Sequence, residues 1–313
     1  MHIPDGYLND PVCLVTTAAS LGTLGAGLIR VRQTAKPGLA LPLAATAAGV
    51  FAAQMVNFPI SPGTSGHLVG AALATWLLGP WAALLAMTVV LTTQCLVFGD
   101  GGLSALGANT LNMAVCGVFV STVVQRVARR ISPARSVQIA AAGVAAWCSV
   151  VTAAALCSFE LAASGELALA EVLSAMLRVH ASIGLGETLI TLAVVAVVTS
   201  SRIAAAGSSP LEPRRFAIGR PAVVGLGLAL GVAALLAPLA SSAPDGLERV
   251  AEDLQFADLA SASLSGFAPD YLAPGIDSPA LAVALAGVLG VLCVFAAAYA
   301  IGRQAVCHAV KNG

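Results

Sequence analysis

The chain has 313 residues, of which 58% are hydrophobic and 10% are charged, and its mean hydropathy is +0.91. Soluble domains carry about 25% charged residues, so this composition predicts a membrane protein that crosses the bilayer several times. The formal net charge is zero and the sequence has no basic stripe, which removes the electrostatic basis for binding nucleic acid. The seven cysteines form no CxxC pair and lie mainly in apolar runs, which is typical of core residues rather than disulfides or a zinc site.

Apolar segments follow one another along most of the chain. They fall at about 11–29, 39–58, 67–79, 81–98, 104–125, 136–159, 179–200, 221–240 and 280–301. Because about 20 apolar residues cross a bilayer, we expect an all-α polytopic membrane protein with about nine transmembrane helices. The third segment is short and ends at Gly79 and Pro80, which is compatible with a re-entrant helix that lines a cavity.

The positive charges favour one orientation in the membrane. With the N-terminus outside and nine spans, the cytoplasmic loops and tail contain nearly all the basic residues: Arg30, Arg32, Lys36, Arg126, Arg129, Arg130, Arg135, Arg202, Arg214, Arg215, Arg220, Arg303 and Lys311. Arg178 and Arg249 remain outside, together with nearly all the acidic residues. Since cytoplasmic loops are enriched in Lys and Arg, we expect the N-terminus outside and the C-terminus inside.

The first two residues, Met1 and His2, predict a metal chelate. The amine of Met1, the amide nitrogen of His2 and the His2 imidazole can close fused chelate rings around one cation. Three nitrogens in a plane suit Ni(II) or Cu(II), which accept tetragonal or square-planar nitrogen sites. The opening residues include Asp5 and Asp10 and lack the basic region of a signal peptide, so we expect the amine to stay free.

A planar site needs a fourth donor, for which His67 is the candidate. His67 follows residues 57–66 (NFPISPGTSG), an uncharged loop on the same predicted side of the membrane as His2. A histidine after such a loop is often structural, but the chelate on the same face favours a role as a ligand. The sequence therefore predicts a metal site formed by Met1, His2 and His67, and no catalytic residue.

Other polar side chains lie within or beside the apolar segments, namely Ser65, Gln94, Asn109, Asn112, His180 and Glu187. His180 and Glu187 are seven residues apart, so they share one face of a helix. They could lie on the path of the metal, or they could hydrogen bond between helices. The three amides could orient the ligand histidines as outer partners, or they could simply hold helices together.

Four motifs together resemble one family of transport proteins. They are residues 1–6 (MHIPDG), 61–67 (SPGTSGH), 98–102 (FGDGG) and 183–187 (IGLGE). Residues 1–200 are similar to the substrate-specific membrane component of energy-coupling-factor (ECF-type) nickel/cobalt transporters, the CbiM/NikM family. Residues 243–248 (APDGLE) resemble the signature of the small PDGLE component of these transporters, which is CbiN/NikN-like.

The resemblance implies a fusion of the two components. A seven-helix metal-binding membrane domain would occupy residues 1–205, and a cytoplasmic linker would follow at 206–220. A PDGLE domain with two spans would occupy residues 221–313, with an outer loop at 241–279. This loop is acidic, and it could attract cations to the entry or simply be solvated.

The resemblance also implies how the metal is held and which metal it is. In that family four nitrogens bind the ion, and these roles fall on Met1, His2 and His67, in agreement with the chelate argued above. The Pro4-Asp5 pair and the fused PDGLE part are more similar to nickel-type than to cobalt-type members. We therefore expect Ni(II) as the transported ion, with Co(II) as the alternative, and no catalytic cofactor.

Uphill transport would require partner chains, because the sequence contains no phosphate-binding GxxxxGK[ST] motif. The resemblance implies a transmembrane coupling component and cytoplasmic ATPase subunits, with the chain in a bacterial plasma (inner) membrane. The outer site would capture the ion, and the loop at 59–66 would close over it. ATP-driven movement of the helix bundle would then expose the ion to the inside.

Three alternative functions follow from the same residues. A cobalt importer component for cobalamin synthesis would use the same site. A secondary metal/proton transporter would use His180 and Glu187 and would need no ATPase. An intramembrane metalloenzyme would normally carry an HExxH pair on a helix, and the sequence has none.

Overall fold

The computed structural model describes residues 1–165, 167–207, 219–261 and 266–312, which form a bundle of helices. The α-helices are α1 (Asp10–Thr34), α2 (Ala40–Gln54), α3 (Ala71–Leu78), α4 (Pro80–Thr93), α5 (Leu106–Asn109), α6 (Gly117–Ile131), α7 (Arg135–Ala163), α8 (Leu169–Gly207), α9 (Gly219–Gly231), α10 (Gly246–Asp253) and α11 (Pro279–Asn312). Stretches of π-helix follow α4, α5 and α9 at Gln94–Phe98, Thr110–Cys116 and Val232–Leu236. Single 3₁₀ turns lie at Ala237–Leu239, Ala257–Leu259 and Pro269–Tyr271.

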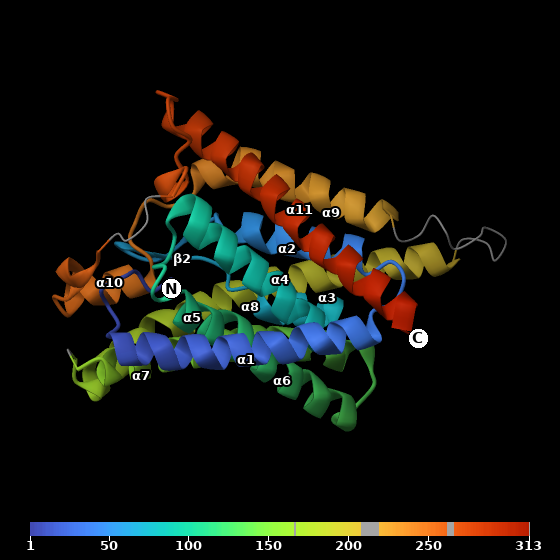
Figure 1. Cartoon of the computed structure of the whole chain (residues 1–313), viewed down its shortest axis with the longest axis horizontal. Coiled ribbons are helices and arrows are strands. Elements are labelled where there is room, and N and C mark those ends of the chain that lie inside the picture. Colours follow the sequence, from blue (N-terminus) through green and yellow to red (C-terminus); the bar gives the residue numbers. More distant parts are fainter. Residues whose placement is uncertain (166, 208–218, 262–265, 313) are drawn as a thin grey trace.

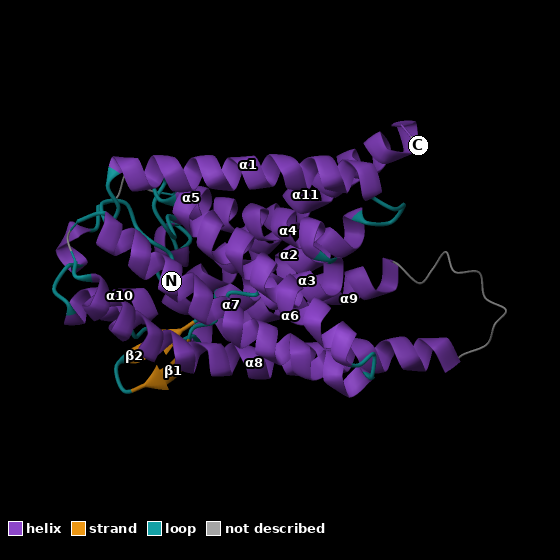
Figure 2. Cartoon of the chain, turned by 90° about the horizontal axis from the view of Figure 1, so that it is seen from below, coloured by secondary structure: helices purple, strands orange, loops and turns teal. Residues whose placement is uncertain are grey.

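The long helices run along one common axis, and the two ends of the bundle differ in what they contain (Figures 1 and 2). The N-terminus, α10 and β2 lie near one end, and the C-terminus lies at the other (Figure 1). The basic residues Arg129 and Arg130 occupy the last turn of α6, which points toward the C-terminal end (Figure 1). The predicted linker at 206–220 falls largely outside the described residues.

Seven helical segments in the described part of the chain are long and apolar enough to cross a membrane. They are Asp10–Thr34, Pro80–Phe98, Leu106–Ile131, Arg135–Ala163, Leu169–Ser200, Pro221–Leu239 and Pro279–Ala309. The other two predicted spans contain α2 and α3, which have only 15 and 8 residues. These helices are about 22 Å and 12 Å long, whereas the hydrocarbon core is about 30 Å thick. The expected number of about nine full spans is therefore corrected to about seven.

Glycine residues set the length of the short helix α3. Gly70 precedes its first residue with φ +84°, and Gly79 follows its last residue with φ +77°. Residues with a side chain rarely adopt this left-handed conformation, so each glycine interrupts the helix. Pro80 then starts α4. His67 consequently lies ahead of the helix, in a segment without regular secondary structure, whereas the prediction started the third span at His67.

A small β-hairpin interrupts the otherwise helical fold. Strands β1 (Phe58–Ser61) and β2 (Thr64–Gly66) pair antiparallel and occupy most of the segment that was expected to be a loop. Gly63 supplies the positive φ (+77°) of the turn between them. The hairpin leads directly to His67, so its register determines where the imidazole lies.

The C-terminal helices pack against the N-terminal part through close contacts between α11 and α2. A Cβ atom at Gly287, Gly290 or Gly302 would lie within 2.8 Å of an atom of α2 or of Met55, which follows α2. At Gly290 it would lie 2.2 Å from Cζ of Phe51. Small residues allow membrane helices to approach closely, so these glycines seat the second domain on the first.

Gly290→Val should therefore destabilise the chain. Overpacking of a tight contact typically costs about 1–3 kcal/mol, because Phe51 has no free space into which it can move. Thermal unfolding in detergent measures the effect. Gly227→Val is the matched control, since a Cβ atom at Gly227 has no neighbour within 4 Å. Equal unfolding temperatures for the two variants would contradict this account of the α2–α11 contact.

Candidate metal-binding site

The N-terminal segment is buried and held by hydrogen bonds to its backbone. Met1 and Ile3 are 4% and 0% exposed. The Asn109 side chain bonds both backbone groups of Ile3: Ile3 N donates to Oδ1 at 2.8 Å, and Nδ2 donates to the Ile3 carbonyl at 3.0 Å. A two-sided amide clamp of this kind fixes the direction of the residues on either side, including His2.

The FGDGG motif forms a cradle for the same segment. Gly102 N donates to the Ile3 carbonyl at 2.8 Å. The Asp5 carboxylate accepts hydrogen bonds from Leu103 N at 3.0 Å and Ser104 N at 2.7 Å. A Cβ atom at Gly102 would lie 2.3 Å from the backbone nitrogen of Asp5, so only glycine permits this approach.

His67 is oriented by hydrogen bonds within the segment that follows β2. Its Nδ1 atom lies 3.0 Å from the Leu68 carbonyl, which can only accept, so Nδ1 donates to it and Nε2 faces the Met1 amine. Val69 and Gly70, which follow Leu68, donate their backbone N–H groups to the Glu187 carboxylate at 2.7 and 2.9 Å. Glu187 therefore fixes the backbone after His67, while the Leu68 carbonyl bonds the other ring nitrogen, as outer partners of metal-bound histidines usually do.

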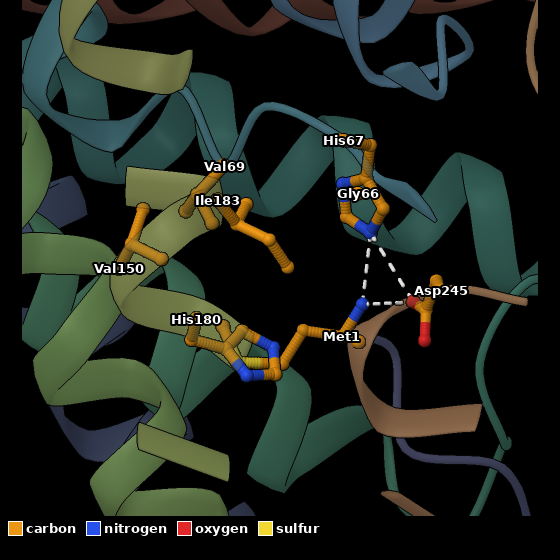
Figure 3. Close-up of a pocket in the computed structure, with 9 residues that line it drawn as sticks. Met1, Gly66, His67, Val69, Val150, His180, Ile183 and Asp245 are labelled. Atoms are coloured by element: carbon orange, nitrogen blue, oxygen red, sulfur yellow. Dashed lines mark hydrogen bonds and ion pairs between the residues drawn. The ribbon is translucent and has the colours of Figure 1, made fainter. Parts of the chain in front are cut away.

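The amine of Met1 lies between two side chains that are far from it in the sequence (Figure 3). It is 2.8 Å from Nε2 of His67 and forms an ion pair with Oδ2 of Asp245. Asp245 Oδ2 lies 3.6 Å from the same His67 nitrogen. Burial by itself raises the pKa of Asp245, but the ammonium group of Met1 and His67 outweigh it and lower this pKa well below its usual value.

His2 completes the cluster. Its ring centroid lies 5.2 Å from that of His67, and its Nδ1 atom lies 3.4 Å from Asp100 Oδ1. The Tyr271 hydroxyl donates to the other Asp100 oxygen at 2.6 Å. Burial lowers the pKa of His2 to about 4, although Asp100 acts in the opposite direction. The imidazole is therefore neutral near pH 7, which is the form that binds metals.

His180 faces the same pocket from α8. The pocket is lined by Met1, Gly66, His67, Val69, Val150, His180, Ile183, Asp245 and Gly246, and it is too narrow to hold a water molecule. His180 Nδ1 lies 2.9 Å from the Met176 carbonyl, which makes Nδ1 the protonated nitrogen. Its Nε2 atom is buried and has no hydrogen-bond partner among the described residues. His180 lies more than two turns inside α8, whereas the sequence predicted it at the start of a span.

The remaining polar residues divide between the site and the helix packing. Ser65 donates its hydroxyl to the Ala243 carbonyl at 2.7 Å, and this bond joins the hairpin to the segment before α10. Asn112 turns away from Asn109 and donates to Glu160 at 2.6 Å. Gln94 is fully buried in the π-helical turn, where its backbone carbonyl accepts a hydrogen bond from Asp100 N at 3.1 Å. Gln94 and Asn112 therefore have no direct contact with the three predicted ligands in the described hydrogen bonds.

The outer loop of the second domain bonds each backbone segment that forms the cluster. Ser65 N donates to the Pro244 carbonyl at 2.9 Å, and Ser261 N donates to the Asp5 carbonyl at 2.8 Å. Ala268 N donates to the Val97 carbonyl at 2.9 Å, just before the FGDGG cradle. The hairpin, the N-terminal segment and the cradle are therefore all tied to the same loop.

Side chains alone do not make a metal site here. In the described ranges no group of three or more His, Cys, Asp or Glu residues is arranged to hold an ion. The cluster instead brings two imidazoles next to a main-chain amine.

Comparison with known families identifies the chain. Residues 2–205 match the family described as the cobalt uptake substrate-specific transmembrane region, CbiM. The chain belongs to the CbiM family. Residues 219–305 match the PDGLE domain. Members of the CbiM family are components of membrane transporters, so the chain is not an enzyme.

Relatives share this arrangement over most of their length. The chain is 39% identical over 309 residues to an Archaeoglobus fulgidus protein named as a fused nickel transport protein, NikMN, covering 97% of this chain and 99% of that protein. It is 34% identical over 297 residues to the fused nickel transport protein NikMN of Rhodobacter capsulatus, and this match covers 88% of this chain and 84% of that protein. The crystal structure of a truncated transition metal transporter covers 64% of this chain and 99% of its own, with a TM-score of 0.58 and 31% identity. The CbiM-family chain is thus a multi-pass helical membrane protein with a transition metal transporter fold.

Two residues of the cluster, Asp245 and Tyr271, were missed by the sequence analysis. Asp245 belongs to the PDGLE motif, and the pattern Asp245-x-x-Glu248 is a recognisable capping box for a helix start. That pattern predicts a cap but gives no sign that the carboxylate reaches residue 1. For Tyr271 we find no signal in the sequence that would have indicated its contact with Asp100.

Asn109→Ala should loosen the N-terminal segment. The variant leaves the buried N–H group of Ile3 unpaired, which costs about 1–3 kcal/mol, while the Ile3 carbonyl keeps its hydrogen bond from Gly102 N. Hydrogen exchange of the Ile3 amide, followed by mass spectrometry, should accelerate by about 5- to 150-fold. Asn112→Ala is the control, because Asn112 bonds Glu160 instead. Unchanged exchange at Ile3 in Asn109→Ala would contradict the clamp.

Proposed function

We propose that the chain is the substrate-capturing membrane component of an ATP-driven nickel uptake transporter. The ion is bound by the amine of Met1, the amide nitrogen and imidazole of His2, and the imidazole of His67. The observation that carries this proposal is the position of the Met1 amine, 2.8 Å from His67 Nε2 in a buried cluster that also contains the His2 ring.

The separation of these two nitrogens is suited to a metal. Two nitrogens that bind one ion at about 2.0 Å and at right angles lie about 2.8 Å apart. Met1 N and His67 Nε2 already have this separation. In the chelate they are neighbouring corners of a plane, with the two His2 nitrogens at the other corners, so little movement of His67 is needed when the ion enters.

Nickel is favoured over cobalt by two observations. A plane of four nitrogens is a natural geometry for Ni(II). The full-length relatives from Archaeoglobus fulgidus and Rhodobacter capsulatus carry nickel transport in their names. Cobalt uptake for cobalamin synthesis is the alternative and uses the same four nitrogens.

The orientation follows from the charges. We place the N-terminal end of the bundle outside the cell, because the opposite end contains the basic ends of α1 and α6 and cytoplasmic ends are enriched in Arg and Lys. The membrane is the bacterial plasma (inner) membrane. The residues up to 205 form the metal-binding domain, and those from 221 form the PDGLE domain.

Transport in this proposal depends on partners. A transmembrane coupling component and cytoplasmic ATPase subunits supply the energy, since the chain carries no phosphate-binding motif. Asn109, Glu187 and Ser65 hold the backbone segments that carry the ligands. His180 lines the same pocket, and its Nε2 atom has no hydrogen-bond partner in the described part of the chain, so in this proposal it is the next group on the path of the ion.

A secondary metal/proton transporter built on His180 and Glu187 is the competing mechanism. Glu187 argues against it, because both of its oxygens already accept backbone N–H groups. The two mechanisms also differ in how they depend on the N-terminus, since only the proposed site requires a free amine at Met1.

A four-residue Gly/Ser extension before Met1 should therefore abolish tight Ni(II) binding. The Met1 nitrogen becomes part of a peptide bond, and the free amine moves four residues away from His2. The chelate ring between the amine and the His2 amide is lost, which should weaken Ni(II) binding by about 100-fold or more. Isothermal titration of the purified chain with Ni(II) and Co(II) measures the affinity and gives the preferred ion. An extension of only one residue is unsuitable, because a histidine in third position is itself a planar nickel chelator.

The matched control inserts the same four residues between Pro37 and Gly38, an exposed loop. This variant should bind Ni(II) like the parent chain, and thermal unfolding verifies that both variants are folded. Unchanged nickel affinity in the N-terminally extended chain would contradict the proposed site and would make His180 and Glu187 the leading candidates.

A further inference from the structure

Asp245 is fixed in orientation by its role at the start of α10. Its Oδ1 atom accepts hydrogen bonds from Leu247 N at 2.8 Å and Glu248 N at 2.9 Å, and Glu248 in turn accepts from Asp245 N at 2.8 Å. This capping box uses one carboxylate oxygen and leaves the other free. The free oxygen, Oδ2, is the atom that meets the Met1 amine (Figure 3).

The first domain holds this helix start in place from two sides. Ser65 bonds the carbonyl groups of Ala243 and Pro244, which directly precede Asp245. On the other side, a Cβ atom at Gly246 would lie 2.9 Å from His180 Nε2 and 2.8 Å from Ile183 Cδ1. Only glycine permits this approach, so residues 243–246 are seated directly against the cluster.

The charge at the site explains why a carboxylate is needed there. In the empty site the ammonium of Met1 faces Asp245. In the loaded site proposed above, the ion contributes two positive charges, the deprotonated His2 amide contributes one negative charge, and the amine and imidazoles are neutral. One positive charge remains in both states, and a buried charge is costly unless it is paired.

Asp100 is the other carboxylate near the nitrogen donors, but it is less suited to this role. Its side chain is 30% exposed, compared with 13% for Asp245. It lies 3.4 Å from His2 Nδ1 and already accepts the Tyr271 hydroxyl. Solvent therefore screens its charge more strongly, and it does not touch the amine in the described contacts.

We propose that Asp245 is a positioning residue of the metal site, whose Oδ2 atom stays on the Met1 amine in the empty and in the loaded state. When Met1 binds the ion, its ammonium group loses one proton and the lone pair goes to the metal. The coordinated amine keeps two N–H groups, so it can still donate a hydrogen bond to Asp245 Oδ2. The bond directs that lone pair toward the ion, as outer partners of metal ligands do. The PDGLE domain then completes a site whose metal donors come from the CbiM region.

Asp245→Asn tests this inference, which rests on the proposed function. Asparagine caps helices as well as aspartate does, so the variant keeps α10 and loses the charge and the strong acceptor. Ni(II) affinity of the full chain, measured by isothermal titration, should fall about 10- to 100-fold. The ligand-field spectrum of the nickel-saturated variant should stay that of the parent chain, because Asp245 does not coordinate the ion.

Two further variants separate the possible causes. Asp258→Asn removes one negative charge from an exposed position of the same loop and should leave Ni(II) affinity unchanged. Asp245→Ala removes both the cap and the charge and should bind at least as weakly as Asp245→Asn. Retained affinity in Asp245→Asn with a loss in Asp245→Ala would mean that Asp245 only caps α10, and this would overturn the inference.

A changed nickel spectrum in Asp245→Asn would also overturn the inference, since Asp245 would then be a ligand. An equal loss of Ni(II) affinity in Asp258→Asn would also overturn the inference, because the negative charge of the loop as a whole would then explain the effect. Comparison with the parent chain and with the N-terminally extended chain distinguishes the proposed function from the proposed role of Asp245. If the extended chain loses Ni(II) but Asp245→Asn does not, the proposed function stands and the role of Asp245 fails.

Discussion

The arrangement of the N-terminal end of this protein depends on one buried positive group, the amine of Met1. Met1 is 4% exposed as a residue, so its charged amine must have partners. The structure supplies His67, which follows the hairpin, and Asp245 from the second domain. Each partner needs its own support, from Glu187 in one case and from the α10 cap in the other. The hairpin, the FGDGG cradle and the PDGLE loop can all be understood as means of holding that amine.

Much of the fold could be predicted from the sequence, because membrane spans are local. Runs of about 20 apolar residues identify a helix without reference to the rest of the chain. Each predicted segment does contain helical residues in the structure. The errors arose where local signals compete. Gly70 and Gly79 cut the third apolar run to eight helical residues, and the β-hairpin formed where Pro and Gly indicated a loop. The prediction of about nine transmembrane helices failed at α2 and α3, of which α3 belongs to the segment that was already expected to be short.

The sequence predicted which residues come together at the proposed site but not what surrounds them. The proximity of Met1, His2 and His67 followed from chelate chemistry and from the side of the membrane on which they were placed. The partners of these residues come from far along the chain: Asn109 bonds Ile3, and Asp245 lies 244 residues from Met1. Such contacts depend on how helices pack, and no periodicity in one sequence reports them. Asn112, which looked equally suitable as an outer partner, bonds Glu160 instead, and the buried amide of Gln94 has no hydrogen-bond partner among the described residues.

X-ray absorption spectroscopy of the purified chain loaded with one equivalent of Ni(II) tests the central claim most directly. The account predicts four nitrogen donors in a plane, with the outer-shell scattering of two imidazoles and no sulfur. The two imidazoles would be those of His2 and His67, and the other nitrogens the amine and the His2 amide. A six-coordinate, oxygen-rich ion, or a sulfur donor from one of the seven cysteines, would contradict the N-terminal chelate.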